Sequence, residues 1–334
     1  MSTTPSFPHL LHAFFHDWMG AQRNASRHTI LSYRDSWRLF LRFVAARRQR
    51  PVARLGLADL TAAEVLAFLE HVETDRGDSI ATRNCRRAAL HSFFHFLAGS
   101  EPPAAQQCES ILRIPHKREP PRAPTYLEAE EVQALLARPD RQSLLGQRDH
   151  TLLWLLYNTG ARIAEALALC PRALRLERPA QVRLVGKGRK ERLCPLWPET
   201  ARLLAALLER QPRAADEPIF VNRYGQPLSA SGARFRLRQH VQAAATQLPR
   251  LAEKHVTPHT LRHTAAVHLI AAGVDVAVIR SWLGHVSLET TNRYAQANLE
   301  TKRKAIEQVD GTTRPAKPPR WRRNADLLDW LDAL

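Results

Sequence analysis

The sequence predicts a mainly α-helical fold with a small β-sheet or hairpin, divided between two domains. The chain has 334 residues, which is more than one small core requires. Apolar residues recur at three- and four-residue spacing along much of the chain, which is the period of a helix facing a core. Two short apolar runs in the second half flank a glycine-containing turn, which is typical of a hairpin.

Residues 1–100 are expected to form a helical bundle. A helix is predicted over 29–44 because one of its faces is apolar. That face consists of Ile30, Tyr33, Trp37, Phe40 and Val44. Thr61 and Glu64 form a capping-box pattern that opens a second helix, and another helix is predicted over 79–97.

Basic residues are abundant on these predicted helices. The whole chain has 49 Lys and Arg against 32 Asp and Glu, which gives a net charge of +17. Such an excess favours a polyanionic partner such as DNA, because Lys and Arg neutralise phosphates. A solvated surface is the alternative explanation. The candidates for DNA contact are Arg34, Arg38, Arg42, Arg83, Arg86, Arg87, Lys117 and Arg118.

Two segments are predicted to link or extend the domains. Residues 101–124 contain six prolines and several basic residues, so an extended basic linker is expected there. Residues 311–334 begin as a second basic, proline-containing stretch, after which Asn324 is expected to cap a short helix. A helix this short needs a groove, in its own chain or in a neighbour, to bury its leucines. These leucines are Leu327, Leu328, Leu331 and Leu334.

Residues 125–310 are predicted to form an α+β second domain. Thr125 and Glu128 form another capping-box pattern at its start. The hairpin is expected from residues 181–185 and 191–195, and 219–221 is a further candidate strand. Helices are expected over 127–138, 148–158, 162–169, 198–211, 230–247, 260–272, 275–283 and 288–297.

Composition argues against a secreted or membrane protein. The four cysteines form no C-x-x-C pair and no disulfide framework, which fits reduced thiols in the cytoplasm. No apolar run approaches the roughly 18 residues that span a bilayer. The N-terminus lacks a basic region before its apolar part, so no secretory signal is expected. We expect a cytoplasmic protein, associated with the nucleoid if its partner is DNA.

Four polar clusters in the second domain contain side chains that a plain helical protein would not need. Gly160 ends one predicted helix just before an arginine, and a Gly-Lys-Gly-Arg-Lys turn joins the two predicted strands. The third cluster places a histidine and an arginine at i and i+3, on one face of a helix. In the fourth, a tyrosine follows Leu-Gly-His by nine residues. The candidate site residues are therefore Arg162, Lys187, His259, Arg262, His285 and Tyr294.

This ordered set resembles the tyrosine recombinase family, which includes phage integrases and the XerC and XerD resolvases. The resemblance lies in ARIAEALAL, VGKGRKERLCPL, TPHTLRHTAAVHLI and LGHVSLETTNRYAQ, in that order. The family's active-site order is Arg, Lys, His-x-x-Arg, His or Trp, and Tyr, and every position is filled. The resemblance implies a catalytic domain over 125–310. It also implies, from a looser match, a SAM-like core-binding domain that binds DNA over 1–100.

The side chains suit displacement at a phosphodiester. Arg162 and Arg262 can grip nonbridging oxygens with permanently charged forks, which removes the need for a metal or other cofactor. Tyr294 supplies a phenol as nucleophile, and His259 can accept its proton. Lys187 is the candidate acid for the leaving 5′-oxygen, and His285 can hydrogen-bond the phosphate. The resemblance implies a 3′-phosphotyrosyl link and a free 5′-hydroxyl, formed within a tetramer that passes through a Holliday junction. It further implies that the C-terminal helix exchanges between protomers.

Several alternatives remain open on the sequence. His259 and His263 have a zinc-like i, i+4 spacing, but no third ligand is evident. Arg189 and Lys190 compete with Lys187 for its role. Glu165 fits the family's buried glutamate, which holds the arginine loop. Other functions are a type IB topoisomerase, a telomere resolvase, or a DNA-binding regulator without catalysis. Among recombinases, mobile-element integration or transposition is preferred over chromosome or plasmid resolution, with accessory recombinases as candidate partners.

Overall fold

The computed structural model describes residues 6–119, 124–186 and 190–284, which form two units divided between Pro121 and Arg122. The first unit is entirely helical in its described part, and the second combines helices with a three-stranded antiparallel sheet. This confirms the predicted mainly helical fold with a small sheet. No helix within the described residues is both long and apolar enough to cross a membrane. The predicted helices at 288–297 and 324–334 lie outside the described residues.

The first unit is a bundle built around aromatic side chains. Trp37, Phe40 and Val44 are buried, so the apolar face predicted on the second helix does form part of the core. Ser26, Thr61 and Ser79 each accept a hydrogen bond from a backbone N–H in the first turn that follows, which fixes where three helices begin. The elements are α1 (Phe7–Ala13), the π-helix η1 (Phe14–Gln22), α2 (Arg27–Arg47), η2 (Val52–Arg54), η3 (Leu57–Asp59), α3 (Ala62–Thr74), α4 (Ile80–Ser100), η4 (Pro102–Ala104) and α5 (Ala105–Leu112).

The extended linker predicted for residues 101–124 is wrong for its first half. Residues 102–104 form η4 and residues 105–112 form α5, which packs against α4. Cys108 and Ile111 on α5 are completely buried in the first core. The prolines that suggested a linker stand at the start of η4 and beyond the end of α5, where a missing N–H does not interrupt a helix.

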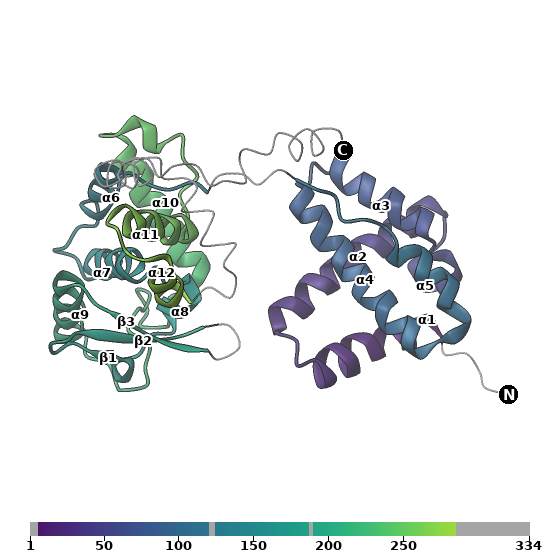
Figure 1. Ribbon diagram of the computed structural model, residues 1–334, viewed down its shortest axis with the longest axis horizontal. Coiled ribbons are helices and arrows are strands. Elements are labelled where there is room, and N and C mark those ends of the chain that lie inside the picture. The colour runs from purple at the N-terminus through teal and green to yellow at the C-terminus, as the bar shows by residue number, and fades with distance from the viewer. Residues whose placement is uncertain (1–5, 120–123, 187–189, 285–334) are drawn as a thin grey trace, which may run out of the picture. The chain divides into compact units, whose positions relative to one another are not determined.

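The second unit places its sheet at one edge of a helical body (Figure 1). The strands are β1 (Leu174–Arg175), β2 (Gln181–Val185) and β3 (Glu191–Pro195), in the order β1-β2-β3. The hairpin has the predicted bounds, with Leu184 opposite Arg192. The helices and short 3-10 turns are α6 (Ala129–Leu136), α7 (Leu144–Thr159), α8 (Ile163–Leu167), η5 (Pro171–Ala173), α9 (Pro198–Arg210), α10 (Ala230–Ala245), η7 (Pro249–Leu251), α11 (Pro258–Ala271) and α12 (Val276–Leu283).

Two local predictions in this unit are corrected. The helix α6 begins after Glu128, whose backbone N–H donates to the Glu131 carboxylate at 2.7 Å, so the predicted Thr125 cap is wrong. Residues 219–221 form no regular strand, because only Val221 pairs, in an isolated bridge with Pro227.

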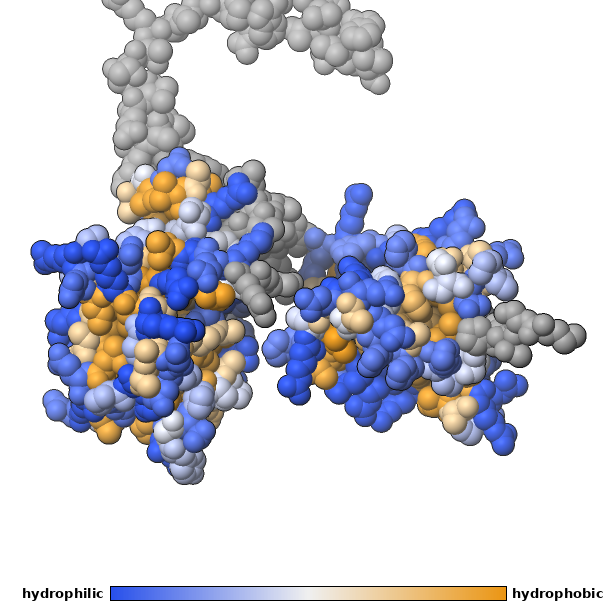
Figure 2. Space-filling model, turned by 90° about the horizontal axis from the view of Figure 1, so that it is seen from below, coloured by the Kyte–Doolittle hydropathy of each residue, from blue (hydrophilic) through white to orange (hydrophobic). Residues whose placement is uncertain are grey.

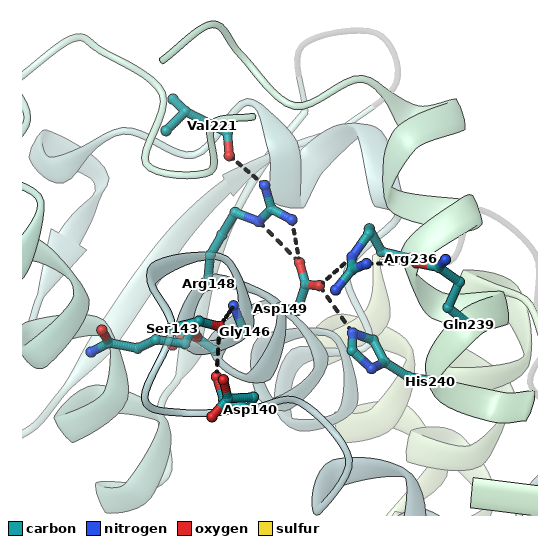
Figure 3. Close-up of polar contacts among 11 residues, drawn as sticks. Asp140, Ser143, Gly146, Arg148, Asp149, Val221, Arg236, Gln239 and His240 are labelled. Carbon is teal, nitrogen blue, oxygen red and sulfur yellow. Dashed lines mark hydrogen bonds and ion pairs between the residues drawn. The ribbon is translucent and has the colours of Figure 1, made fainter. Parts of the chain in front are cut away.

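A buried carboxylate fixes α10 against α7 (Figure 3). The Asp149 side chain is 3 % exposed and accepts from Arg148 on its own helix, at 2.6 and 2.9 Å. Its other oxygen accepts from Arg236 at 2.7 Å and from His240 at 2.9 Å, both on α10. Arg148 also donates to the Val221 carbonyl. These bonds compensate for burying the charges, as a buried ion pair requires.

Candidate functional site

The described candidate residues gather where α7, α11 and α12 meet. The helix α7 ends at Gly160, whose φ of 57° is left-handed, and Arg162 stands as the N-cap of α8 two residues later. A Cβ at Gly160 would lie only 2.3 Å from Leu283 Cδ2, so only glycine permits this approach of α7 to the end of α12. The predicted order, a helix ended by Gly160 and a new one begun at Arg162, is confirmed.

Arg262 joins the ends of two helices. It lies in the first turns of α11 and is 3 % exposed. Its Nη1 donates to the Gly160 carbonyl at 2.5 Å, and its Nη2 donates to the Leu283 carbonyl at 2.6 Å. A guanidinium is favoured there because helix C-termini carry partial negative charge. Arg262 is thereby held in one place beside the loop that carries Arg162.

His259 lies one turn before Arg262, with part of its side chain open to solvent and part of it covered by neighbouring residues. Partial burial of the ring, together with the positive charges of Arg262, Arg162 and Arg234, lowers the pKa of His259 below its ordinary value. The ring is therefore neutral at pH 7 and able to accept a proton. His259 and Arg262 stand three residues apart on one face of α11, and Arg262 holds the Gly160 carbonyl two residues before Arg162, so the three side chains belong to one cluster.

His263 stacks beside His259 but is less exposed. Their ring centroids are 6.2 Å apart, at 25° between planes. Burial, with the charges of His259 and Arg262, lowers the pKa of His263 to about 4. Within the part of the chain that the structure describes, no group of three or more His, Cys, Asp or Glu side chains could hold a metal ion. The zinc alternative therefore finds no third ligand among those residues.

Glu165 organises the polar side of the site. Its side chain is 4 % exposed, and it accepts from the Arg162 backbone N–H and from Arg162 Nη1, both at 2.9 Å. Arg192 on β3 donates to the same carboxylate at 2.7 Å. Burial alone would raise the pKa of Glu165, but the bonds and charge from Arg192 and Arg162 outweigh it and lower the pKa. The glutamate expected to hold the arginine loop is thus found to bind Arg162 directly.

Three candidates, Lys187, His285 and Tyr294, lie outside the described residues. The structure does describe the residues directly before Lys187 and His285. Gly186 precedes Lys187, and its N–H donates to the Lys190 carbonyl at 2.8 Å to close the hairpin. Gly284 precedes His285 and caps α12 in a left-handed conformation, with φ at 64°. The competing Lys190 is exposed.

Two residues of this site were not predicted from the sequence. Arg192 connects Glu165 to the Trp282 carbonyl, to which its Nε donates at 2.9 Å. Period-two alternation could have found it, because Arg192 shares a face of β3 with the buried Cys194. Arg234, exposed on α10, had no such signal, since its approach to His259 depends on how α10 packs.

The eight basic residues proposed to contact DNA have different surroundings. Arg83, Arg86 and Arg87 are already engaged within the first unit, by Asn84, Asp78 and the Ile114 carbonyl respectively. Lys117 pairs with Glu73, and Arg34 with its neighbour Asp35. Arg38, Arg42 and Arg118 are exposed, and no hydrogen bond or ion pair to another described residue is found for them. The face in Figure 2 is mainly hydrophilic, interrupted by apolar patches.

Comparison with known proteins agrees with this arrangement. The phage integrase family pattern matches residues 125–301, and the pattern of the phage integrase N-terminal SAM-like domain matches 13–100. An integrase/recombinase of Sinorhizobium fredii, y4rC, is 39% identical over 334 residues, which covers the whole of both chains. Tyrosine recombinase XerC of Rhodospirillum centenum is 37% identical over 85% of this chain and 81% of its own.

Solved structures show the same fold. The XerH site-specific recombinase bound to its difH substrate aligns with a TM-score of 0.64 at 24% identity, over 85% of this chain and 81% of that chain. The Tn1549 transposon integrase in complex with circular intermediate DNA aligns with a TM-score of 0.63 at 18% identity, over 88% of this chain and 98% of that chain. The match of family pattern, full-length relative and fold, together with the arginine–histidine cluster, leads to one conclusion: this chain belongs to the phage integrase family and is a tyrosine-type site-specific recombinase.

Proposed function

We propose that the protein cuts and rejoins double-stranded DNA through a covalent bond between Tyr294 and the 3′-phosphate, with release of a 5′-hydroxyl. The observation that carries this is the shared setting of Arg162, Arg262 and a neutral His259. Two fixed positive charges can stabilise the charge that develops on the phosphate. The neutral imidazole can take the phenol proton, which a phenol with a pKa of about 10 does not release readily at neutral pH.

The remaining roles complete an ATP-independent exchange. Lys187 protonates the leaving 5′-oxygen, and His285 hydrogen-bonds the phosphate. The phosphotyrosine retains the energy of the broken ester, so a 5′-hydroxyl from another strand can attack it and restore the backbone. We further propose that four protomers perform two such exchanges, with a Holliday junction between them. The DNA-bound recombinases among the structural neighbours support DNA as the partner.

The test uses a DNA duplex with a nick near the cleavage site, from which the short 5′-hydroxyl fragment diffuses away and leaves the adduct trapped. Wild-type protein should give a covalent protein–DNA band with a free 5′-hydroxyl on the released strand. Tyr294→Phe should give none. Tyr224→Phe is the matched control, because Tyr224 is 71% exposed on a turn of the same unit and takes no part in the site. An adduct that persists in Tyr294→Phe would refute the mechanism, and binding without any adduct would favour a regulator.

For the biological role we propose integration or transposition of a mobile element. Resolution of chromosome or plasmid dimers is the second candidate, and it is favoured by the relatives named XerC. Mapping the DNA bound by the protein in its own host separates the two. Sites at the ends of an element beside its gene support mobility, whereas one chromosomal site of fixed position supports resolution.

A further inference from the structure

The carboxylate of Glu165 lies between the loop that carries Arg162 and Gly186, the residue that follows β2 in the β2–β3 hairpin. One face of the carboxylate holds Arg162 through its backbone and its guanidinium. On another side lies Gly186, where a Cβ would stand 3.0 Å from Glu165 Oε1. That distance is tighter than side-chain contacts normally allow, so a glycine lets the hairpin approach this closely. Gly186 is the last described residue before Lys187.

Arg192 extends this connection to a third segment. It stands on β3 opposite Leu184, and its side chain is 10% exposed. Its Nη2 binds Glu165 at 2.7 Å while its Nε binds the Trp282 carbonyl, in the last turn of α12, at 2.9 Å. A Cβ at Gly284 would lie 3.1 Å from Arg192 Cδ, so the chain just before His285 rests on the arginine stem.

A planar guanidinium is suited to this position because its fork can hold two acceptors in fixed directions. Both partners differ from those of an exposed ion pair. The Arg192 side chain is 10% exposed and that of Glu165 is 4% exposed, so water weakens their ion pair little, and the Trp282 carbonyl lies at a helix C-terminus, whose partial negative charge favours a guanidinium. Arg192 therefore fixes the hairpin relative to Arg162 and to α12 at the same time.

We propose that Arg192 is a positioning residue that sets where the hairpin presents Lys187 to the leaving 5′-oxygen. This inference rests on the proposed function. In that step Tyr294 Oη forms a bond to phosphorus, and the bond from phosphorus to the 5′-oxygen breaks. The phenol proton passes to His259, and the 5′-oxygen takes a proton from the Lys187 ammonium. In this proposal Arg192 is not assigned a contact with the reacting atoms and acts through Gly186 and Glu165.

The experiment compares a substrate whose leaving 5′-oxygen needs a proton from Lys187 with a substrate whose leaving atom does not. Two nicked duplexes are compared: one with an ordinary scissile phosphate, and one with sulfur in place of the bridging 5′-oxygen. A thiolate leaves without protonation, so the sulfur substrate does not require a general acid. The proteins are wild type, Arg192→Ala, Arg192→Lys and Lys187→Ala. Arg183→Ala is the control, because Arg183 lies on the same hairpin and pairs only with Glu191 across the strands in the described structure.

Arg192→Ala should slow single-turnover cleavage of the ordinary substrate about tenfold or more, since a positioned general acid contributes roughly 10²–10⁴-fold. On the sulfur substrate it should cleave within about threefold of wild type, as Lys187→Ala should. Arg192→Lys keeps the charge but replaces the fork by a single ammonium, so it should show the same pattern to a smaller degree. Arg183→Ala should match wild type on both substrates.

Equal losses on both substrates would overturn the proposal, because they would mean that Arg192 only supports the fold. Full activity of Arg192→Ala on the ordinary substrate would overturn it as well. If Arg192→Ala does not fold, Arg192→Lys decides the question on the same criterion. Failure of the wild type to form an adduct on either substrate would instead contradict the proposed function, so the two failures are distinguishable.

Discussion

At the scale of single residues, neighbouring charges and burial shift the pKa values of the ionisable side chains in the site. His259 is the clearest case, because burial and three arginines all disfavour its protonation. A base with a lowered pKa stays active to lower pH than an ordinary histidine. The electrostatics therefore predict how the reaction depends on pH.

The acid limb of the cleavage rate should lie below pH 6.5, the ordinary pKa of histidine, since protonated His259 cannot accept the phenol proton. Arg234→Ala removes a positive charge that acts on His259, so the pKa should rise and the limb should move to higher pH. Arg238→Ala, one turn further along α10 and also exposed, should leave the limb in place. Single-turnover cleavage between about pH 5 and 8 measures this. A limb that does not move in Arg234→Ala would contradict the assignment.

At the scale of elements, α10 depends on one buried carboxylate. Burial would raise the pKa of Asp149, but the hydrogen bond from His240, the charge of Arg148, and further bonds from Arg236 and Arg148 outweigh it and lower the pKa. A depressed carboxyl pKa stabilises the fold above the unfolded pKa of about 4. This contribution disappears as the pH falls through the folded pKa.

Asp149→Asn should destabilise the second unit by about 3–5 kcal/mol at pH 7, because it leaves the buried Arg148 charge uncompensated. Urea unfolding at several pH values measures the change, and the difference from wild type should shrink below about pH 4 as the wild-type carboxylate is protonated. Asp216→Asn, which removes an exposed partner of Arg172, is the control and should change stability little. A difference that stayed constant down to about pH 3 would mean that the charge of Asp149 is not responsible.

Some basic residues of the first unit bind partners within that unit, and others are exposed and can contact DNA. Arg38→Gln with Arg42→Gln should weaken DNA binding and reduce the slope of log affinity against log salt by about 0.9 for each phosphate that is no longer neutralised. The melting temperature should not change, because neither side chain forms an ion pair with another described residue.

Arg86→Gln should instead lower the melting temperature of the protein, because Arg86 holds the largely buried Asp78 at 2.9 Å. Equal salt slopes for the double variant and wild type would exclude Arg38 and Arg42 from the DNA interface.

At the scale of the whole molecule, the predicted role of the C-terminal segment can be tested separately from chemistry. We expect deletion of residues 324–334 to weaken assembly of the tetramer on DNA, because the leucines of that segment need an apolar groove on a protomer. Cleavage of a half-site by one bound protomer should be nearly unchanged. Gel-shift analysis of assembled complexes, beside adduct formation on the half-site, measures both. Unchanged tetramer formation after the deletion would rule out this role.

Much of the fold was predictable because local patterns specified it. The hairpin bounds followed from two apolar runs around glycines, and the apolar face over 29–44 predicted most of α2, whereas the Ser26 and Ser79 caps that begin α2 and α4 were found only in the structure. The linker prediction failed for α5, because prolines outside a helix do not prevent the helix between them. Its burial depends on Cys108 and Ile111 meeting a core that other segments build.

The sequence by itself determined the family, the order of the candidate catalytic residues and the helical character of both units, because these are properties of residue type and spacing along the chain. Only the tertiary structure decided which charges act on one another. Glu165, Arg192 and the Trp282 carbonyl are far apart in sequence, and their bonds exist only once β3 and α12 pack together. The same applies to Arg83, Arg86 and Arg87, which the sequence suggested for DNA contact. Their partners Glu73, Asp78 and the Ile114 carbonyl lie outside α4. Ionic and hydrogen-bonding contacts act over a few ångströms in space, and spacing along the chain does not fix that distance.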